Sequence, residues 1–259
     1  MKNHPFHLVD NSPWPITGSL GLMTVTSGMI LWLHKMNQTL MLIGISIILM
    51  TMYQWWRDIT RESTFQGMHT IKVSLSMKIG MIMFIASEIM FFLSFFWAFL
   101  HSSLSPNVEI GMLWPPKNIK VFNPMNIPML NTMILLSSGM SMTWAHNAML
   151  NKNYSQLIQS MVITITLGIY FSTLQFYEYL MSSFSLSDSI YGSTFFMSTG
   201  FHGIHVMIGT VFIIVSTMRV MCLHMSKTHH IGFEASAWYW HFVDVIWLFL
   251  YMLVYWWGS

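Results

Sequence analysis

Apolar runs of about 20 residues recur along nearly the whole chain. Such a run can cross a bilayer as a helix, because a helix rises about 1.5 Å per residue and the hydrocarbon core is about 30 Å thick. Seven runs satisfy this criterion, over residues 16–33, 39–56, 79–100, 127–150, 157–181, 190–218 and 233–257. The pattern therefore predicts an all-α membrane protein with seven transmembrane helices.

A long polar stretch separates the second run from the third. It divides the chain into an N-terminal two-helix hairpin (1–56), a linker loop (57–78) and a five-helix bundle (79–259). We expect a two-plus-five arrangement of helices, with a groove between the two groups that is open to lipid.

Composition agrees with a membrane protein, since only 8% of residues are charged and 54% are hydrophobic. The net charge of +2 is too small, and the basic residues too scattered, for a nucleic-acid-binding surface. Cys222 is the single cysteine, which excludes an internal disulfide, a zinc ribbon and an iron–sulfur site with four thiolates. No phosphate-binding loop, nucleophile elbow or HExxH motif is present, so no motif supports a hydrolase or a nucleotide-driven pump.

The basic residues predict the orientation. With seven spans the two termini lie on opposite sides of the membrane. Lysine and arginine are more frequent on the N-terminal side (Lys2, Arg57, Arg61, Lys72, Lys78, Lys152, Arg219 and Lys227) than on the other side (Lys35, Lys117 and Lys120). The positive-inside rule therefore places the N-terminus on the inner side, which is the matrix or the cytoplasm.

Glu88 is an isolated acid in the third run, IGMIMFIASEIMFFLSFFWAFL. An ionised carboxylate is costly at that depth and needs a partner, water or a proton, so the position is a functional-site hypothesis by default. Measured from the inner end, Glu88 lies roughly 13 Å deep, and His205 on the sixth run lies roughly 20 Å deep. A side-chain contact between them is feasible if the two helices touch. The alternative is a protonated Glu88 bonded to a serine or a backbone carbonyl.

Three further polar groups lie inside predicted spans. His202 shares a helix face with His205, but a metal or haem site needs more ligands, and His101 and His146 lie at unmatched depths. We therefore interpret His202 as a buried, hydrogen-bonded histidine. His241 and Asp244 are three residues apart on one helix, so we expect a structural pair.

Aromatic and basic side chains meet at the inner end of the second span, in residues 53–62, with His69 and Lys72 following. Together with Arg219 and Lys227 they could hold anionic lipid head groups. A solvated face next to the membrane is the alternative.

Several motifs in order strongly resemble subunit III of mitochondrial cytochrome c oxidase, and the likeness covers nearly the whole chain. They are MYQWWRD (52–58), RESTFQG (61–67), FFWAFLHSSLSP (95–106), WPP (114–116), YGSTFF (191–196), TGFHGIHV (199–206), HHIGFEASAWYWHFVDVIWLFLY (229–251) and the terminal YWWGS.

The resemblance implies seven helices in a two-plus-five arrangement around a cleft filled by phospholipid. It implies no catalytic residue, haem or metal on this chain, because the haem and copper centres belong to subunits I and II. Those subunits and accessory subunits are the implied partners. The implied location is the mitochondrial inner membrane, with the N-terminus in the matrix and the C-terminus in the intermembrane space.

The resemblance also assigns roles to residues. It associates Glu88 and His205 with sustained proton uptake and with protection of the catalytic subunit from inactivation during turnover. It also implies that five side chains contact lipid head groups: Trp56, Arg61, Glu62, His69 and Arg219. The chain departs from the family pattern at Asn147, where a second histidine is usual, at residues 180–183, and at Cys222, near a position that is often basic.

The favoured function is that of a non-catalytic subunit of the terminal respiratory oxidase, which transfers electrons from cytochrome c to O₂ while protons cross the membrane. A seven-span proton-coupled transporter that uses Glu88 and Asp244 is the alternative, although it does not explain the motifs. A membrane haem protein is a third hypothesis.

Overall fold

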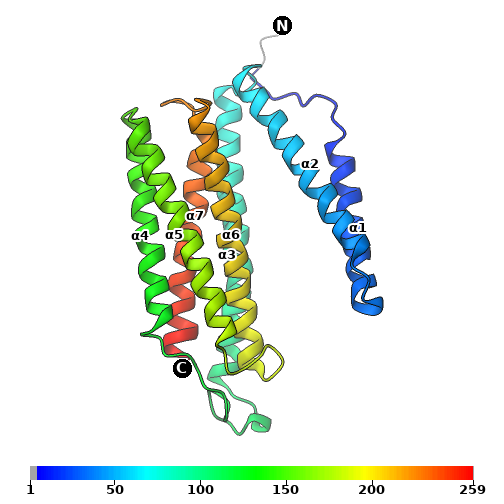
Figure 1. The fold of residues 1–259 in the computed structure, drawn as a ribbon, viewed down its shortest axis with the longest axis vertical. Helices are drawn as coiled ribbons and strands as arrows, with labels where there is room; N and C mark the ends of the chain where they lie inside the picture. Colours follow the sequence, from blue (N-terminus) through cyan, green and yellow to red (C-terminus); the bar gives the residue numbers. More distant parts are fainter. Residues whose placement is uncertain (1–4, 259) are drawn as a thin grey trace. The chain divides into compact units, whose positions relative to one another are not determined.

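The structure, a computed structural model, describes residues 5–258 and consists of helices and their connections (Figure 1). The long helices are α1 (Trp14–Lys35), α2 (Thr39–Thr64), α3 (Ile71–Leu104), α4 (Ile127–Leu150), α5 (Tyr154–Leu180), α6 (Ile190–Met221) and α7 (Ile231–Leu250). A 3₁₀ turn occupies Val108–Ile110, and α7 continues into a π-helical segment, Tyr251–Trp257. The prediction of seven helices is confirmed. Lys2, which entered the orientation argument, lies outside the described residues.

Six of the long helices in the described part of the chain are apolar enough to cross a membrane by length and composition. The exception is α4, which has 24 residues but carries many serine, threonine and asparagine side chains. Most of these polar groups are buried against neighbouring helices, including Asn131, Ser138 and Ser141. Its low hydropathy thus reflects polar groups that face protein rather than lipid.

The connection between α2 and α3 is shorter than the predicted loop over 57–78. Residues 57–64 continue α2 and residues 71–78 belong to α3, so that residues 65–70 make the connection. Hydropathy detects where a helix leaves the apolar core but not where the helix ends, which explains the difference. The chain divides into two compact units, Met1–Met77 and Lys78–Ser259.

In the first unit, α1 and α2 pack closely through glycines. A Cβ atom on Gly28 would collide with the backbone of Met41, and one on Gly44 would lie 2.6 Å from Oγ1 of Thr24. Small residues let helix backbones approach in a membrane, where no hydrophobic effect drives helices together. The pair is therefore held by close backbone contact rather than by a large core.

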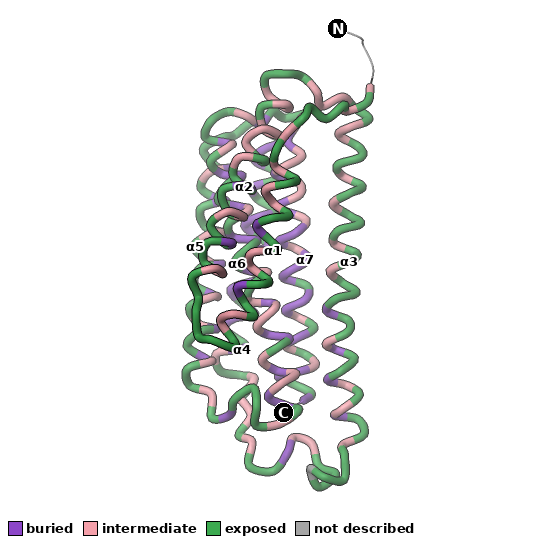
Figure 2. Tube along the Cα trace, turned by 90° about the vertical axis from the view of Figure 1, so that its right-hand side faces the viewer, coloured by how far each residue is buried: buried purple, intermediate pink, exposed green. Residues whose placement is uncertain are grey.

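The core of the second unit lies among α4, α5, α6 and α7. Buried residues gather along these helices, whereas most of α3 is exposed or half-buried (Figure 2). Two tryptophans of α7 donate indole hydrogen bonds to hydroxyl groups of α4: Trp240 to Ser138 at 2.9 Å and Trp247 to Thr132 at 3.0 Å. Side-chain hydrogen bonds of this kind link helices in lipid.

Within the second unit, α3 is attached mainly by aromatic side chains. Phe92, Phe96 and Phe99 are its large buried residues. Two polar contacts add to them. Lys78 Nζ lies 2.6 Å from Glu234 Oε2 at the start of α7, and Glu88 contacts His205 of α6. The second contact lies near the middle of the membrane-spanning part of α3.

Candidate functional site

Glu88 of α3 and His205 of α6 form a hydrogen bond, with 2.9 Å between Glu88 Oε2 and His205 Nε2. The two side chains keep 22% and 12% of their surfaces exposed. The pair is thus neither fully enclosed nor fully open. This is the contact that the comparison of helix depths made feasible.

The second ring nitrogen of His205 fixes how the pair holds protons. His205 Nδ1 lies 2.7 Å from the carbonyl oxygen of Phe201. Because a carbonyl oxygen only accepts, Nδ1 must carry a proton and donate it. Nε2 then either accepts a proton from a neutral Glu88 carboxyl or donates one to the Glu88 carboxylate. In both states the pair shares one proton and has no net charge.

Aromatic rings enclose the imidazole of His205. The ring of Phe92 lies edge-on at 4.9 Å between centroids, and Tyr239 stacks on the imidazole at 6.3 Å. Phe91 lies 6.3 Å from it on the α3 side. Apolar surroundings of this kind penalise a net charge on the pair. The neutral, one-proton state is therefore the favoured one.

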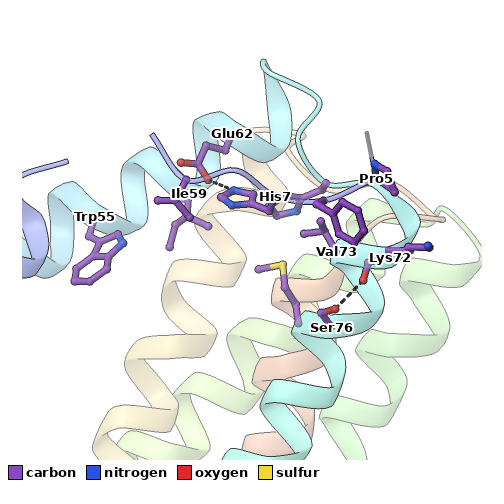
Figure 3. Close-up of a pocket in the computed structure, with 12 residues that line it drawn as sticks. Pro5, His7, Trp55, Ile59, Glu62, Lys72, Val73 and Ser76 are labelled. Atoms are coloured by element: carbon purple, nitrogen blue, oxygen red, sulfur yellow. Dashed lines mark hydrogen bonds and ion pairs between the residues drawn. The ribbon is translucent and has the colours of Figure 1, made fainter. Parts of the chain in front are cut away.

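A separate pocket of about 610 Å³ lies within the first unit (Figure 3). Its lining comes from the N-terminal segment, the end of α2 and the start of α3: Pro5, Phe6, His7, Val9, Trp55, Ile59, Glu62, His69, Lys72, Val73, Ser76 and Met77. His7 Nε2 bonds Glu62 Oε2 at 2.8 Å, and Lys72 Nζ lies 5.7 Å from the centre of the Phe6 ring. The pocket combines an apolar wall with charged groups.

The predicted head-group residues do not all meet in this pocket. Glu62 and His69 line it, whereas Trp56 and Arg61 are exposed on α2 and are not among its lining residues. Arg219 belongs to the second unit, where its guanidinium group lies over Gly232 and its Nε atom is buried without a hydrogen-bond partner among the described residues. The sequence did not single out the N-terminal segment that supplies His7.

The other predicted polar groups have different surroundings. His202 is fully buried, and its Nε2 lies 3.1 Å from the carbonyl oxygen of Val243 on α7, to which it donates. Its ring packs against Phe171 and Trp247. For Asp244 the structure shows no hydrogen bond to His241 within residues 5–258, and the Oδ1 atom of Asp244 is buried without a partner. The expected bond inside the His241 and Asp244 pair is therefore not formed.

Sequence reasoning missed a further buried acid, Glu178 of α5. Glu178 is 1% exposed, and the hydroxyl group of Tyr255 donates a hydrogen bond to Glu178 Oε1 at 2.6 Å. Gln175 donates to the Tyr255 hydroxyl and Asn131 donates to Gln175, each at 3.3 Å. The available signal was a glutamate, three residues after a glutamine, inside an apolar run. Its position close to the end of that run makes it hard to distinguish from an interfacial acid.

Among residues 5–258, no three histidine, cysteine, aspartate or glutamate side chains gather in a way that could hold a metal ion.

Comparison with known proteins decides the family. The family model described as cytochrome c oxidase subunit III matches residues 4–259. The chain belongs to this family. It is 60% identical to cytochrome c oxidase subunit 3 of Aedes aegypti over 257 residues, which cover 99% of this chain and 98% of that relative. The corresponding proteins of Drosophila melanogaster and Heterololigo bleekeri are 59% and 58% identical, with full coverage of this chain and 98% and 100% of theirs.

Membership in the subunit III family makes the chain a multi-pass membrane subunit of cytochrome c oxidase. Membership in this family sets aside the hypothesis of a proton-coupled transporter. Subunit III carries no redox centre itself, which sets aside the hypothesis of a membrane haem protein. The family implies assembly with other oxidase subunits. Glu88 and His205 therefore belong to a redox complex, although the redox chemistry takes place elsewhere in it.

Proposed function

We propose that the Glu88–His205 pair handles protons for the oxidase in which this chain is a non-catalytic subunit. The observation that carries the proposal is the hydrogen bond between Glu88 and His205, in which the bond of His205 Nδ1 to the Phe201 carbonyl oxygen leaves one proton for the two side chains to share. Partial exposure of both side chains supports exchange of that proton with the surroundings. A pair that remains neutral as the proton shifts avoids the cost of a lone charge in lipid.

The variant Glu88→Gln tests this role. Glutamine keeps the size of the side chain and a hydrogen-bonding group, but it cannot release a proton. We expect the oxidase to assemble, retain its haem and reduce O₂, with altered proton uptake or faster inactivation during turnover. Steady-state O₂ consumption measured together with proton release gives the answer. Loss of electron transfer at normal haem content would contradict the accessory role.

We further propose that the chain holds phospholipid through the pocket of the first unit and the basic groups Arg61 and Arg219. The charged and apolar lining of the pocket supports a lipid head group with part of its acyl chains. Each basic group near an anionic membrane surface contributes only about 1 kcal/mol, so binding must be shared. The lipid-filled cleft between the two helix groups stays a prediction.

Mass spectrometry of lipids that copurify with the complex tests the lipid role. Replacing Arg61 and Arg219 together by glutamine should deplete anionic phospholipid. Lys152→Gln, at an exposed basic residue between α4 and α5, is the matched control. Equal lipid content in both variants would exclude the proposed contacts.

The location and partners complete the proposal. We infer a place in the mitochondrial inner membrane beside subunits I and II, which hold the haem and copper, and beside accessory subunits. The basic residues support an N-terminus in the matrix and a C-terminus in the intermembrane space. Protease protection in vesicles of known sidedness tests the orientation, and both termini on one side would contradict it.

A further inference from the structure

Residues 5–13 lead into α1 and form neither helix nor strand. We call them the N-terminal strap. Among residues 5–258, residues 7–12 make no hydrogen bond from backbone to backbone. Chain termini are poorly ordered unless contacts tie them down, and segments with few such bonds open at a low cost in free energy. The position of the strap therefore depends on bonds that involve side chains.

Two hydrogen bonds tie the ends of the strap to the rest of the first unit. At one end, the hydroxyl group of Thr70, just before α3, donates to the carbonyl oxygen of Pro5 at 2.6 Å. At the other end, the indole of Trp14, the first residue of α1, donates to Asp58 Oδ2 on α2 at 2.7 Å. Neither Thr70 nor Trp14 lines the pocket of the first unit. These two bonds can thus be removed without changing the pocket walls.

The strap itself is one wall of this pocket (Figure 3). Four of the twelve lining residues belong to the strap: Pro5, Phe6, His7 and Val9. The others come from α2, from the start of α3 and from their connection. One further bond, from His7 Nε2 to Glu62 Oε2 at 2.8 Å, joins the strap to α2 inside the pocket. Movement of the strap would remove this wall and open the pocket without any change in α2.

We propose that the N-terminal strap is the lid of this pocket, and that its opening controls how fast a phospholipid enters and leaves. The bonds of Thr70 to Pro5 and of Trp14 to Asp58 hold the lid closed. The occupant is a phospholipid because apolar side chains and charged groups both line the pocket. The inference rests on the proposed lipid role of the pocket and adds control of exchange, which a static site does not have.

Lipid exchange in the assembled complex tests the lid. The pocket lipid is first identified by mass spectrometry as the species that Glu62→Gln depletes. Complexes are then mixed with the deuterated form of that lipid, and replacement of the bound lipid is followed with time. The double variant Thr70→Val/Trp14→Phe removes both donors and should exchange about tenfold faster or more. Thr60 donates only to the Trp56 carbonyl oxygen of its own helix, so Thr60→Val is the matched control and should exchange at the unmodified rate.

Motion of the strap is measured separately, with a nitroxide label on Leu8→Cys. Leu8 is 65% exposed and does not line the pocket. Labelled complexes that retain Leu8 supply the background from Cys222, which is exposed, and from other thiols. We expect freer label motion in the double variant than in Thr60→Val.

The two readouts separate the lid from the lipid role. Unchanged label motion in the double variant, or freer motion with unchanged lipid exchange, would overturn the lid and leave the lipid role standing. If Glu62→Gln depletes no lipid, the lipid role of the pocket itself is refuted, and the lid with it.

Discussion

Glu88 and Glu178 both lie on membrane-spanning helices of the second unit, but their surroundings differ. Glu178 is 1% exposed and accepts a hydrogen bond from the hydroxyl of Tyr255. Glu88 keeps 22% of its side chain exposed and bonds the imidazole of His205. An acid bonded to a phenol inside the protein has little means to exchange its proton, whereas a partly exposed acid bonded to an imidazole has a second group with which to share one.

The two acids also differ in what they connect. The Glu178 network joins α4, α5 and the π-helical segment through Asn131, Gln175 and Tyr255. The Glu88 pair joins α3, the least buried helix of the second unit, to α6. We infer that the first network maintains the core, while the second holds a peripheral helix at a place where protons can enter and leave.

Substitution of Glu178 should have the largest effect on stability. Glu178→Ala leaves the hydroxyl hydrogen of Tyr255 without an acceptor in the core, which costs about 1 to 3 kcal/mol, and creates a cavity that adds about 2 kcal/mol or more. Glu178→Gln keeps an acceptor and should cost about 1 kcal/mol. Thermal release of the chain from the detergent-solubilised complex measures both. Equal stability of the alanine variant and the unmodified chain would contradict a structural role.

Substitution of Glu88 should have a smaller effect on stability. Glu88→Ala leaves His205 Nε2 without a partner, and we expect a cost of about 1 kcal/mol, at the low end of the usual range because the side chains are only partly buried. Glu88→Gln should lie close to the unmodified chain. The same thermal-release assay compares them with the Glu178 variants. A larger loss for Glu88→Ala than for Glu178→Ala would reverse the comparison.

Glu62 gives the smallest expected effect, because its pair with His7 lies near the surface of the first unit, with 19% and 24% of the side chains exposed. Pairs at such positions contribute about 0 to 1 kcal/mol. Glu62→Gln should thus leave thermal release unchanged within error and alter only the lipid content of the pocket. Lipid mass spectrometry checks the second effect, and a clear loss of stability would show that the pair has a structural role.

Helix number and the contact of Glu88 with His205 could be anticipated from the sequence, because both depend on local hydropathy and on depth along a helix. The end of α2 could not, since residues 57–64 leave the apolar run while remaining helical. The Glu178 network was hidden because Asn131, Gln175 and Tyr255 are far apart in the chain and only packing brings them together. No hydrogen bond joins His241 and Asp244 within residues 5–258, although both side chains lie over Gly139 of α4, and the structural role of the pair stays a prediction.

The central claim is that Glu88 serves proton handling and Glu178 serves structure. Its most direct test measures proton release per electron, and the rate of inactivation during turnover, in complexes with Glu88→Gln or Glu178→Gln at equal haem content. We expect Glu88→Gln to change one or both quantities at nearly normal thermal release, and Glu178→Gln to change neither. Normal values for Glu88→Gln, or the same change in both variants, would contradict the claim.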